Sequence, residues 1–161
     1  MKTPESDDGI APDDIERLQL RRLHESLDAI LPTNAFYKSK LSAVGVTDGA
    51  DVASMEDYAR LPFTTKEELS EDQQANPPYG TNLTYSADRY VRMHQTSGTT
   101  GRPLKWLDTE ASWAWFGSCW VDVFRGAGVT DADRVFFPFS FGPFIGFWTA
   151  YEGARQVGAM A

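Results

Sequence analysis

The sequence has almost none of the side chains that build disulfides and transition-metal centres. Its 161 residues include one cysteine, Cys119, and two histidines, His24 and His94. A lone cysteine cannot form an internal disulfide and suits a reducing compartment. The two histidines belong to no cluster with metal-ligand spacing, so we expect no metal site built from this chain. Cys119 falls within an aromatic helical stretch, which favours a buried, inert thiol over a nucleophile.

The chain also has little positive charge. It carries 15 lysine and arginine residues against 23 acidic residues, for a net charge of −8. A nucleic-acid partner would require a basic face, so this composition argues against one. The first residues are acidic, where a secretion signal would be basic and then apolar. These features together predict a cytoplasmic protein.

No apolar run predicts a transmembrane helix. The uncharged stretch 135–151 is interrupted by Pro138, Gly142, Pro143 and Gly146. It is too short and too often broken for a confident span. We therefore expect no membrane span, and we interpret the stretch as a buried strand, a turn and a helix.

Hydrophobic periodicity and capping residues predict an α/β fold. Residues 1–14 are acidic and poor in apolar side chains, so we expect a disordered tail there. Expected helices cover 15–31, 34–44, 51–59, 66–71, a long one from Asp108 or Thr109 to about Ala127, and 145–157; expected strands cover 90–95 and 134–138. This order predicts N-terminal helices followed by part of a three-layer domain with parallel strands. The apolar run 156–161 is typical of a strand start, so we expect the domain to be truncated.

The run from Gln95 to Lys105 is the most informative feature of the sequence. It combines four hydroxyl side chains and two glycines with the cations Arg102 and Lys105, between the expected strand 90–95 and the helix from Thr109. Glycines let backbone amides converge on an anion, and hydroxyls add donors. A loop between a strand and a helix is where α/β proteins hold nucleotides. We therefore predict a phosphate-binding loop, with a solvated turn as the alternative, at Thr96, Ser97, Gly98, Thr99, Thr100 and Gly101.

This loop differs from two common nucleotide motifs. Gly101 is followed by Arg102 and Pro103, whereas a Walker A loop needs Gly-Lys followed by Ser or Thr. The dinucleotide pattern Gly-x-Gly-x-x-Gly is not matched either. Ser97 has no visible His or Asp partner that would make it a nucleophile, and we assign no catalytic residue to this chain. His94, next to the loop, is a weaker candidate for a substrate or phosphate contact.

A second candidate site is the aromatic turn, which we define as residues 139–146. It interleaves phenylalanines with glycines directly after the expected strand 134–138. α/β proteins expose the carboxyl ends of their strands to ligands, and aromatic rings commonly wall apolar pockets. We predict a substrate pocket, with simple core packing as the alternative, lined by Phe139, Phe141, Gly142 and Phe144.

Four segments, in the right order, resemble one known family. Thr96–Pro103 matches the phosphate-binding loop of the adenylate-forming (AMP-binding) superfamily, which includes acyl-CoA synthetases, luciferases and peptide-synthetase adenylation domains. Most members place a lysine directly after the proline, whereas this chain has Leu104 there and Lys105 one position later. The phenylacetate-CoA ligases also tend to lack that lysine. Other segments resembling those ligases are Leu61–Leu69, Asn34–Lys38 and the stretch from Asp133 into the aromatic turn. The resemblance covers roughly residues 15–161 and implies the N-terminal part of an AMP-binding large domain, here incomplete.

The resemblance implies an ATP-dependent ligase that joins an aryl or acyl carboxylic acid to coenzyme A through an acyl-adenylate. The loop would cradle the ATP phosphates, Mg²⁺ would bridge them, and the aromatic turn would line the acid site. The family's catalytic lysine and adenine-binding turn lie beyond these residues, so the chain alone is expected to be inactive. Two alternatives remain: a non-catalytic fragment or interaction module, and an adenylating enzyme with an acceptor other than coenzyme A.

Overall fold

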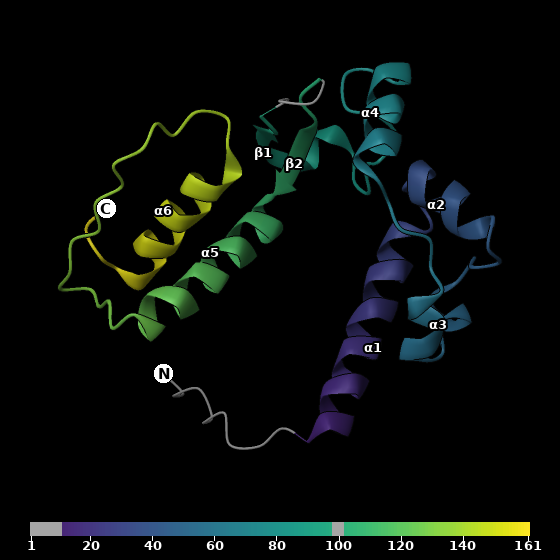
Figure 1. Ribbon diagram of the computed structural model, residues 1–161, viewed down its shortest axis with the longest axis horizontal. Helices are drawn as coiled ribbons and strands as arrows, with labels where there is room; N and C mark the ends of the chain where they lie inside the picture. The colour runs from purple at the N-terminus through teal and green to yellow at the C-terminus, as the bar shows by residue number, and fades with distance from the viewer. Residues whose placement is uncertain (1–10, 98–101) are drawn as a thin grey trace. The chain divides into compact units, whose positions relative to one another are not determined.

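The computed structural model describes residues 11–97 and 102–161, apart from the side chains of Pro12 and Asp13. The chain forms two compact units (Figure 1). The first unit contains the described residues up to Lys66 together with Thr81–Thr84. The second unit contains Glu67–Gly80 and Tyr85–Ala161. Each unit is described by itself below.

The first unit is helical. Its elements are α1 (Pro12–Ile30), α2 (Ala35–Ser42), the 3₁₀ turn η1 (Gly49–Asp51) and α3 (Met55–Ala59). In Figure 1, α2 and α3 lie along the same side of α1. The core between them consists of aliphatic side chains, which are buried because their transfer from water is favourable: Leu27, Leu31, Leu41, Val46 and Val52. The expected helices are confirmed here in place but not in bounds. Helix α1 begins at Pro12 rather than Ile15, and α2 ends at Ser42 rather than about Val44. The expected helix 51–59 is helical only from Met55.

Asn34 starts α2 and also ties a distant segment to this unit. Its side-chain oxygen accepts a hydrogen bond from the Tyr37 amide at 3.1 Å, as expected for an N-cap. Its amide nitrogen donates to Asn82 at 3.1 Å and to Thr84 at 3.2 Å. Asn34 is 2% exposed, so these bonds satisfy polar atoms that would otherwise be buried without partners.

The second unit contains a β-hairpin and a helix pair. It comprises most of α4 (Lys66–Ala75), the 3₁₀ turn η2 (Ala87–Arg89), β1 (Tyr90–Gln95), β2 (Lys105–Thr109), α5 (Glu110–Gly126) and α6 (Ile145–Val157). β1 and β2 pair antiparallel, with His94 opposite Trp106 and Gln95 opposite Lys105. Strand β2 therefore lies between the loop and α5. The sequence predicted a strand, a loop and a helix here, and did not predict this second strand. The nine residues between β1 and β2 are too few for a parallel crossover, so an antiparallel pair is the geometric outcome.

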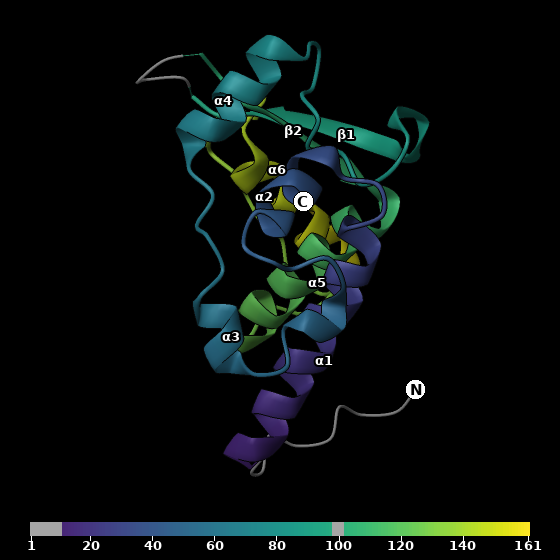
Figure 2. The same ribbon diagram turned by 90° about the vertical axis from the view of Figure 1, so that its right-hand side faces the viewer.

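Helices α5 and α6 lie side by side, as both views show (Figures 1 and 2). Thr109 caps α5, since its hydroxyl oxygen accepts from the Ser112 amide at 3.1 Å. One stripe of α5 is buried, formed by Trp113, Gly117 and Val121. The expectation that Cys119 is a buried thiol is wrong: Cys119 is exposed, and Trp115 in the same aromatic stretch is 62% exposed. A helix with a single described helical neighbour buries only the face towards it.

The expected buried strand 134–138 is also not formed. Only Arg134 pairs, in a parallel bridge with Met160, and α6 connects the two positions. Val135 donates to the Met160 carbonyl at 2.8 Å, and Met160 donates to the Asp133 carbonyl at 3.1 Å. Phe136 is 85% exposed, because no described element covers this segment. The parallel β-α-β arrangement is thus present as a single bridge, and the β1–β2 sheet is antiparallel.

Within the two described stretches, no helix has the length and apolarity to cross a bilayer.

Gly153 allows α5 and α6 to approach closely. A Cβ atom at Gly153 would clash with Cβ of Trp120 and lie 3.2 Å from the Gly117 carbonyl oxygen. Gly153→Ala should lower the free energy of unfolding by about 1–2 kcal/mol, because overpacking outweighs the gain in helix propensity. Gly146→Ala in the same helix meets nothing within 4 Å and is the matched control, expected to be neutral or slightly stabilising. Thermal melts of both variants check this, and equal melting temperatures would contradict it.

Candidate functional site

Two hydrogen bonds between Thr96 and Leu104 hold together the two ends of the predicted phosphate-binding loop, and we call this pair the loop neck. The Thr96 amide donates to the Leu104 carbonyl at 3.0 Å, and the Leu104 amide donates to the Thr96 hydroxyl at 3.0 Å. Leu104 is 3% exposed and anchors the neck, whereas Ser97 is exposed beyond it. Gly98, Thr99, Thr100 and Gly101 lie outside the described residues. The phosphate role of all six loop residues stays a prediction.

Gln73 of α4 supports the loop neck and was not found by sequence reasoning. Its amide nitrogen donates to the Lys105 carbonyl at 2.8 Å, and its amide oxygen accepts from the Lys105 amide at 3.0 Å. The carboxamide thus replaces a neighbouring strand at the first residue of β2. The partners are 32 residues apart, and a single glutamine in a polar helix gives no sequence signal. The Lys105 ammonium group donates to the Pro78 carbonyl at 3.1 Å, so it is anchored on this side of the hairpin.

His94 and Asp108 lie on the buried face of the hairpin. They are 4% and 7% exposed, and Nδ1 of His94 is 3.6 Å from a carboxylate oxygen of Asp108. The His94 ring stacks on Trp113 with 5.2 Å between centroids. The other carboxylate oxygen of Asp108 accepts from the Ser112 hydroxyl at 3.0 Å. The histidine is therefore a packed residue beneath the loop neck, and the structure gives no support to a direct phosphate contact.

The surroundings of His94 lower its pKa below the ordinary value of 6.5. Burial is the largest cause, because it disfavours the charged imidazolium. The Asp108 carboxylate opposes this effect, and the positive charge of Arg92 adds to it. His94 is thus neutral over a wider pH range in the folded protein than in the unfolded chain.

Stability should therefore fall when the pH drops below about 6.5. In that range the unfolded chain binds a proton at His94 that the folded chain resists, so protonation favours unfolding until the folded pKa is passed. Above the unfolded pKa this contribution to stability is fully present. Melting temperatures measured between roughly pH 7.5 and 5 should decline in the wild type and decline less in His94→Phe, which keeps an aromatic ring on Trp113. Parallel declines in both proteins would contradict the assignment.

The aromatic turn is attached to β1. The Gln95 amide donates to the Pro143 carbonyl at 3.0 Å, and Trp148 Nε1 donates to the Gly142 carbonyl at 2.9 Å. The turn therefore meets the hairpin one residue before the loop neck. This connection brings the two predicted sites together within one unit.

The four predicted pocket residues are not equivalent. Phe141 is half-buried, and its ring centroid is 4.8 Å from that of Trp148 and 5.9 Å from that of Tyr151. Phe139 stacks on Phe147 at 4.5 Å and is 58% exposed, and Phe144 is 41% exposed at the start of α6. The structure thus gathers Phe141 and Gly142 around Trp148, with Phe139 in a separate ring pair. The pocket role of Phe139, Phe141, Gly142 and Phe144 stays a prediction, and Trp148 and Tyr151 join the candidates.

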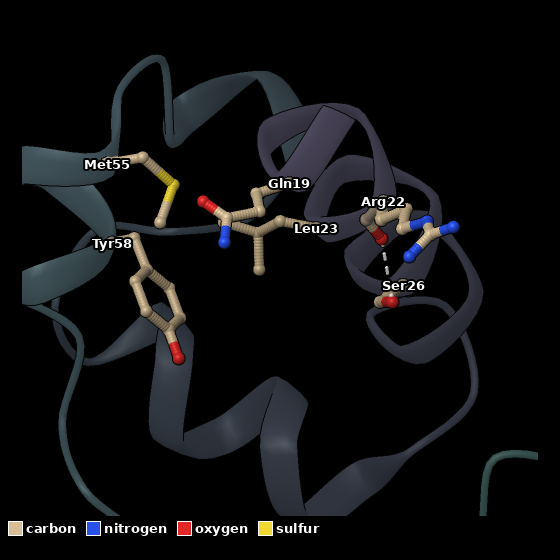
Figure 3. A pocket seen from close by; sticks show the side chains of 6 residues that line it. All are labelled: Gln19, Arg22, Leu23, Ser26, Met55 and Tyr58. Atoms are coloured by element: carbon tan, nitrogen blue, oxygen red, sulfur yellow. Dashed lines mark hydrogen bonds between the residues drawn. The ribbon is translucent and has the colours of Figure 1, made fainter. Parts of the chain in front are cut away.

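A cavity in the first unit offers no comparable chemistry. It has a volume of about 350 Å³ and lies between α1 and α3 (Figure 3). Its lining is mixed, and the one hydrogen bond drawn joins the Ser26 hydroxyl to the Arg22 carbonyl at 2.8 Å. No predicted site residue belongs to this unit. Nor do any three His, Cys, Asp or Glu side chains within residues 11–97 and 102–161 form a group that could hold a metal ion. The cavity lining comprises Gln19, Arg22, Leu23, Ser26, Met55 and Tyr58.

Comparison with known proteins connects this arrangement to a family of ligases. No protein-family model matches the chain. The phenylacetate-coenzyme A ligase of Escherichia coli (strain K12) is 29% identical over 147 residues, which are 91% of this chain and 32% of that protein. The phenylacetate-coenzyme A ligase of Aromatoleum evansii is 31% identical over 169 residues, with 98% of this chain and 36% of that protein covered.

A solved structure has the same fold over this length. It is a 2-hydroxyisobutyryl-CoA ligase in complex with 2-HIB-AMP and CoA in the thioesterification state. Its TM-score is 0.87 and its identity 27%, and the match covers 98% of this chain and 35% of that one. The chain therefore spans about a third of the length of the relatives it matches. These matches confirm the α/β fold class and the resemblance: over 91–98% of its length the chain is similar to adenylate-forming coenzyme A ligases, among them phenylacetate-coenzyme A ligases.

Proposed function

We propose that this chain is a segment of an ATP-dependent acid–coenzyme A ligase that carries the phosphate-binding loop and part of the acid pocket. The observation that carries the proposal is the Gln95–Pro143 hydrogen bond, which joins the aromatic turn to β1 next to the loop neck. Nucleotide phosphates at the loop and an acid at the turn would then lie near each other. The similarity to phenylacetate-coenzyme A ligases over 91–98% of the chain supports the same reaction class.

The proposed reaction has two steps. A carboxylate oxygen of the acid attacks the α-phosphorus of ATP, and pyrophosphate leaves with the electrons of the broken P–O bond. The thiolate sulfur of coenzyme A then attacks the acyl carbon, and AMP leaves. The first step requires stabilisation of the charge on the β- and γ-phosphates, which hydroxyls and backbone amides of residues 96–101 would supply. Mg²⁺, when bound, would offset part of the negative charge of those phosphates, and no residue of this chain is assigned to it.

The substrate is proposed to be an aryl or acyl carboxylic acid. Phe141 and Trp148 form an aromatic wall that an apolar acid could contact. No residue of this chain is proposed to transfer a proton or form a covalent bond. Because the chain spans only about a third of the length of the relatives it matches, the 161-residue chain alone is expected to have no turnover.

Pyrophosphate exchange by the complete ligase tests the function. Each acid of a panel, including phenylacetate and 2-hydroxyisobutyrate, is incubated with ATP, Mg²⁺ and labelled pyrophosphate, and label entering ATP is measured. Acid-dependent exchange followed by thioester formation with coenzyme A is the expected result. Exchange without a thioester would point to a different acceptor. No acid-dependent exchange across the panel would overturn the proposal, and a reaction without acid is the control.

A further inference from the structure

Arg92 is an exposed cation on the hairpin face that α5 covers. It lies opposite Asp108 in the β-ladder, and its neighbour on the same face is His94. The centre of its guanidinium group is 4.7 Å from the ring centroid of Trp113 and 5.9 Å from that of Trp148. Two indoles, one from α5 and one from α6, therefore hold a single arginine by cation–π attraction.

The guanidinium group has no acidic partner among the described residues. No carboxylate within residues 11–97 or 102–161 pairs with it, whereas Asp108 is engaged with Ser112 and lies beside His94. A guanidinium group that stacks on an aromatic ring through its flat face keeps its N–H donors free in its plane, in the fork that matches a carboxylate. The two indole rings hold the Arg92 side chain at this place, and without an ion pair to a described residue its donors are left for another group.

The position of Arg92 connects the two predicted sites. It lies in β1, four residues before Thr96 of the loop neck, and Trp148 joins it to Phe141 and to the Gly142 carbonyl. An acid whose apolar part contacted Phe141 and Trp148 could place its charged end at the guanidinium group. The carboxylate would then be held near the strand that leads to the phosphate loop.

We propose that Arg92 binds the carboxylate of the acid substrate and orients it for attack on ATP. This inference rests on the proposed function and names the residue that recognises the charged end of the substrate. In the complex with bound acid, before reaction, the guanidinium group of Arg92 donates two hydrogen bonds to the carboxylate. These bonds orient the carboxylate towards the nucleotide. Trp113 and Trp148 are the positioning residues that fix the guanidinium plane.

Direct binding to the complete ligase tests this without turnover. Phenylacetate, 2-hydroxyisobutyrate and the primary amide of each are titrated without ATP by calorimetry, into the wild type, Arg92→Lys and Arg92→Gln. The wild type should prefer each acid to its amide. Arg92→Gln should lose about ten- to a hundredfold in affinity for the acids and little for the amides, since one charge-assisted contact is removed. Arg92→Lys should be intermediate, because it keeps the charge and loses the fork.

Arg89→Gln is the matched control, since Arg89 is an exposed arginine in the turn directly before β1. It should bind acids and amides as the wild type does. An unchanged preference for acids in Arg92→Gln, or no acid binding by the wild type, would overturn the proposal. In a separate titration with ATP, a weakened ATP affinity of Arg92→Gln together with an unchanged acid affinity would also overturn the proposal, by assigning the guanidinium group to phosphate. Acid binding that depends on Arg92 in a protein without pyrophosphate exchange would refute the proposed function and the orienting role, and would leave only the carboxylate contact of Arg92 standing.

Discussion

Thr99→Ala in the complete ligase should slow the adenylation half-reaction by about ten- to a hundredfold. The change removes one hydroxyl donor to a charged phosphate oxygen, a bond worth about 1.5–3 kcal/mol where it forms. Gly98→Val should be at least as damaging, because valine resists positive φ and obstructs a close approach of backbone to phosphate. Both expectations rest on the proposed function and on the sequence of the loop. Pyrophosphate exchange at saturating acid, with ATP varied, is the measurement.

The second half-reaction supplies the internal control for these loop variants. Thioester formation from supplied acyl-adenylate should be less affected, because the β- and γ-phosphates have left by then. Ser118→Ala is the matched hydroxyl deletion, since Ser118 is exposed on α5 and, among the described residues, its hydroxyl donates locally to the Trp115 carbonyl. Circular dichroism must first show that all variants are folded. Wild-type exchange rates in folded Gly98→Val and Thr99→Ala would mean that the loop is only a turn.

Much of the secondary structure could be predicted because its signals are local. Asn34 and Thr109 cap helices through bonds to amides three residues ahead, and such bonds depend only on nearby sequence. Strand β1 and helix α6 were predicted with the bounds that the structure gives, 90–95 and 145–157. α4 extends four residues beyond its expected end at Glu71, because nothing in its polar sequence before Asn76 stops a helix.

The prediction failed where structure depends on distant partners. Strand β2 has only five residues, and its pairing with β1 and with Gln73 decides its conformation. The segment 134–138 is rich in phenylalanine, but burial requires neighbouring elements, and none of the described ones covers Phe136. The same reasoning applies to Cys119: it shares a face of α5 with Trp115, and both are exposed because no described element covers that face.

The candidate site was predicted in part for the same reason. The loop and the aromatic turn are contiguous sequence patterns, so composition alone singled them out. Arg92 and Trp148 are 56 positions apart, and only the packing of β1, α5 and α6 brings them together. Gln73 and Lys105 likewise meet only in the folded unit. A sequence pattern can thus propose which loops bind a ligand, while the side chains that orient it are found from contacts.

Substitution of Gln73 is expected to destabilise the loop neck and weaken ATP binding. The Gln73 carboxamide bonds to both the backbone amide and the backbone carbonyl of Lys105. Gln73→Ala leaves a carbonyl and an amide without this partner and should cost about 1–2 kcal/mol, with water replacing part of the loss. Gln73→Glu should cost about 2–3 kcal/mol, since a carboxylate would face the Lys105 carbonyl and repel it. The loosened strand adjoins the loop neck. We therefore expect at least an approximately tenfold rise in the KM for ATP during pyrophosphate exchange, with little change in acid affinity.

Hydrogen exchange at β2 separates a local effect from general unfolding. In Gln73→Ala the backbone amides around Lys105 should exchange faster, whereas those in the buried stripe of α5 should keep wild-type protection, because local opening needs less free energy than global unfolding. Gln74→Ala is the matched control: the neighbouring amide bonds only to Ser70 within α4, at 3.2 Å. If Gln73→Ala and Gln74→Ala have the same exchange pattern and the same KM for ATP, the carboxamide does not position the loop. Faster exchange at Lys105 together with an unchanged KM would show instead that the loop tolerates a mobile β2.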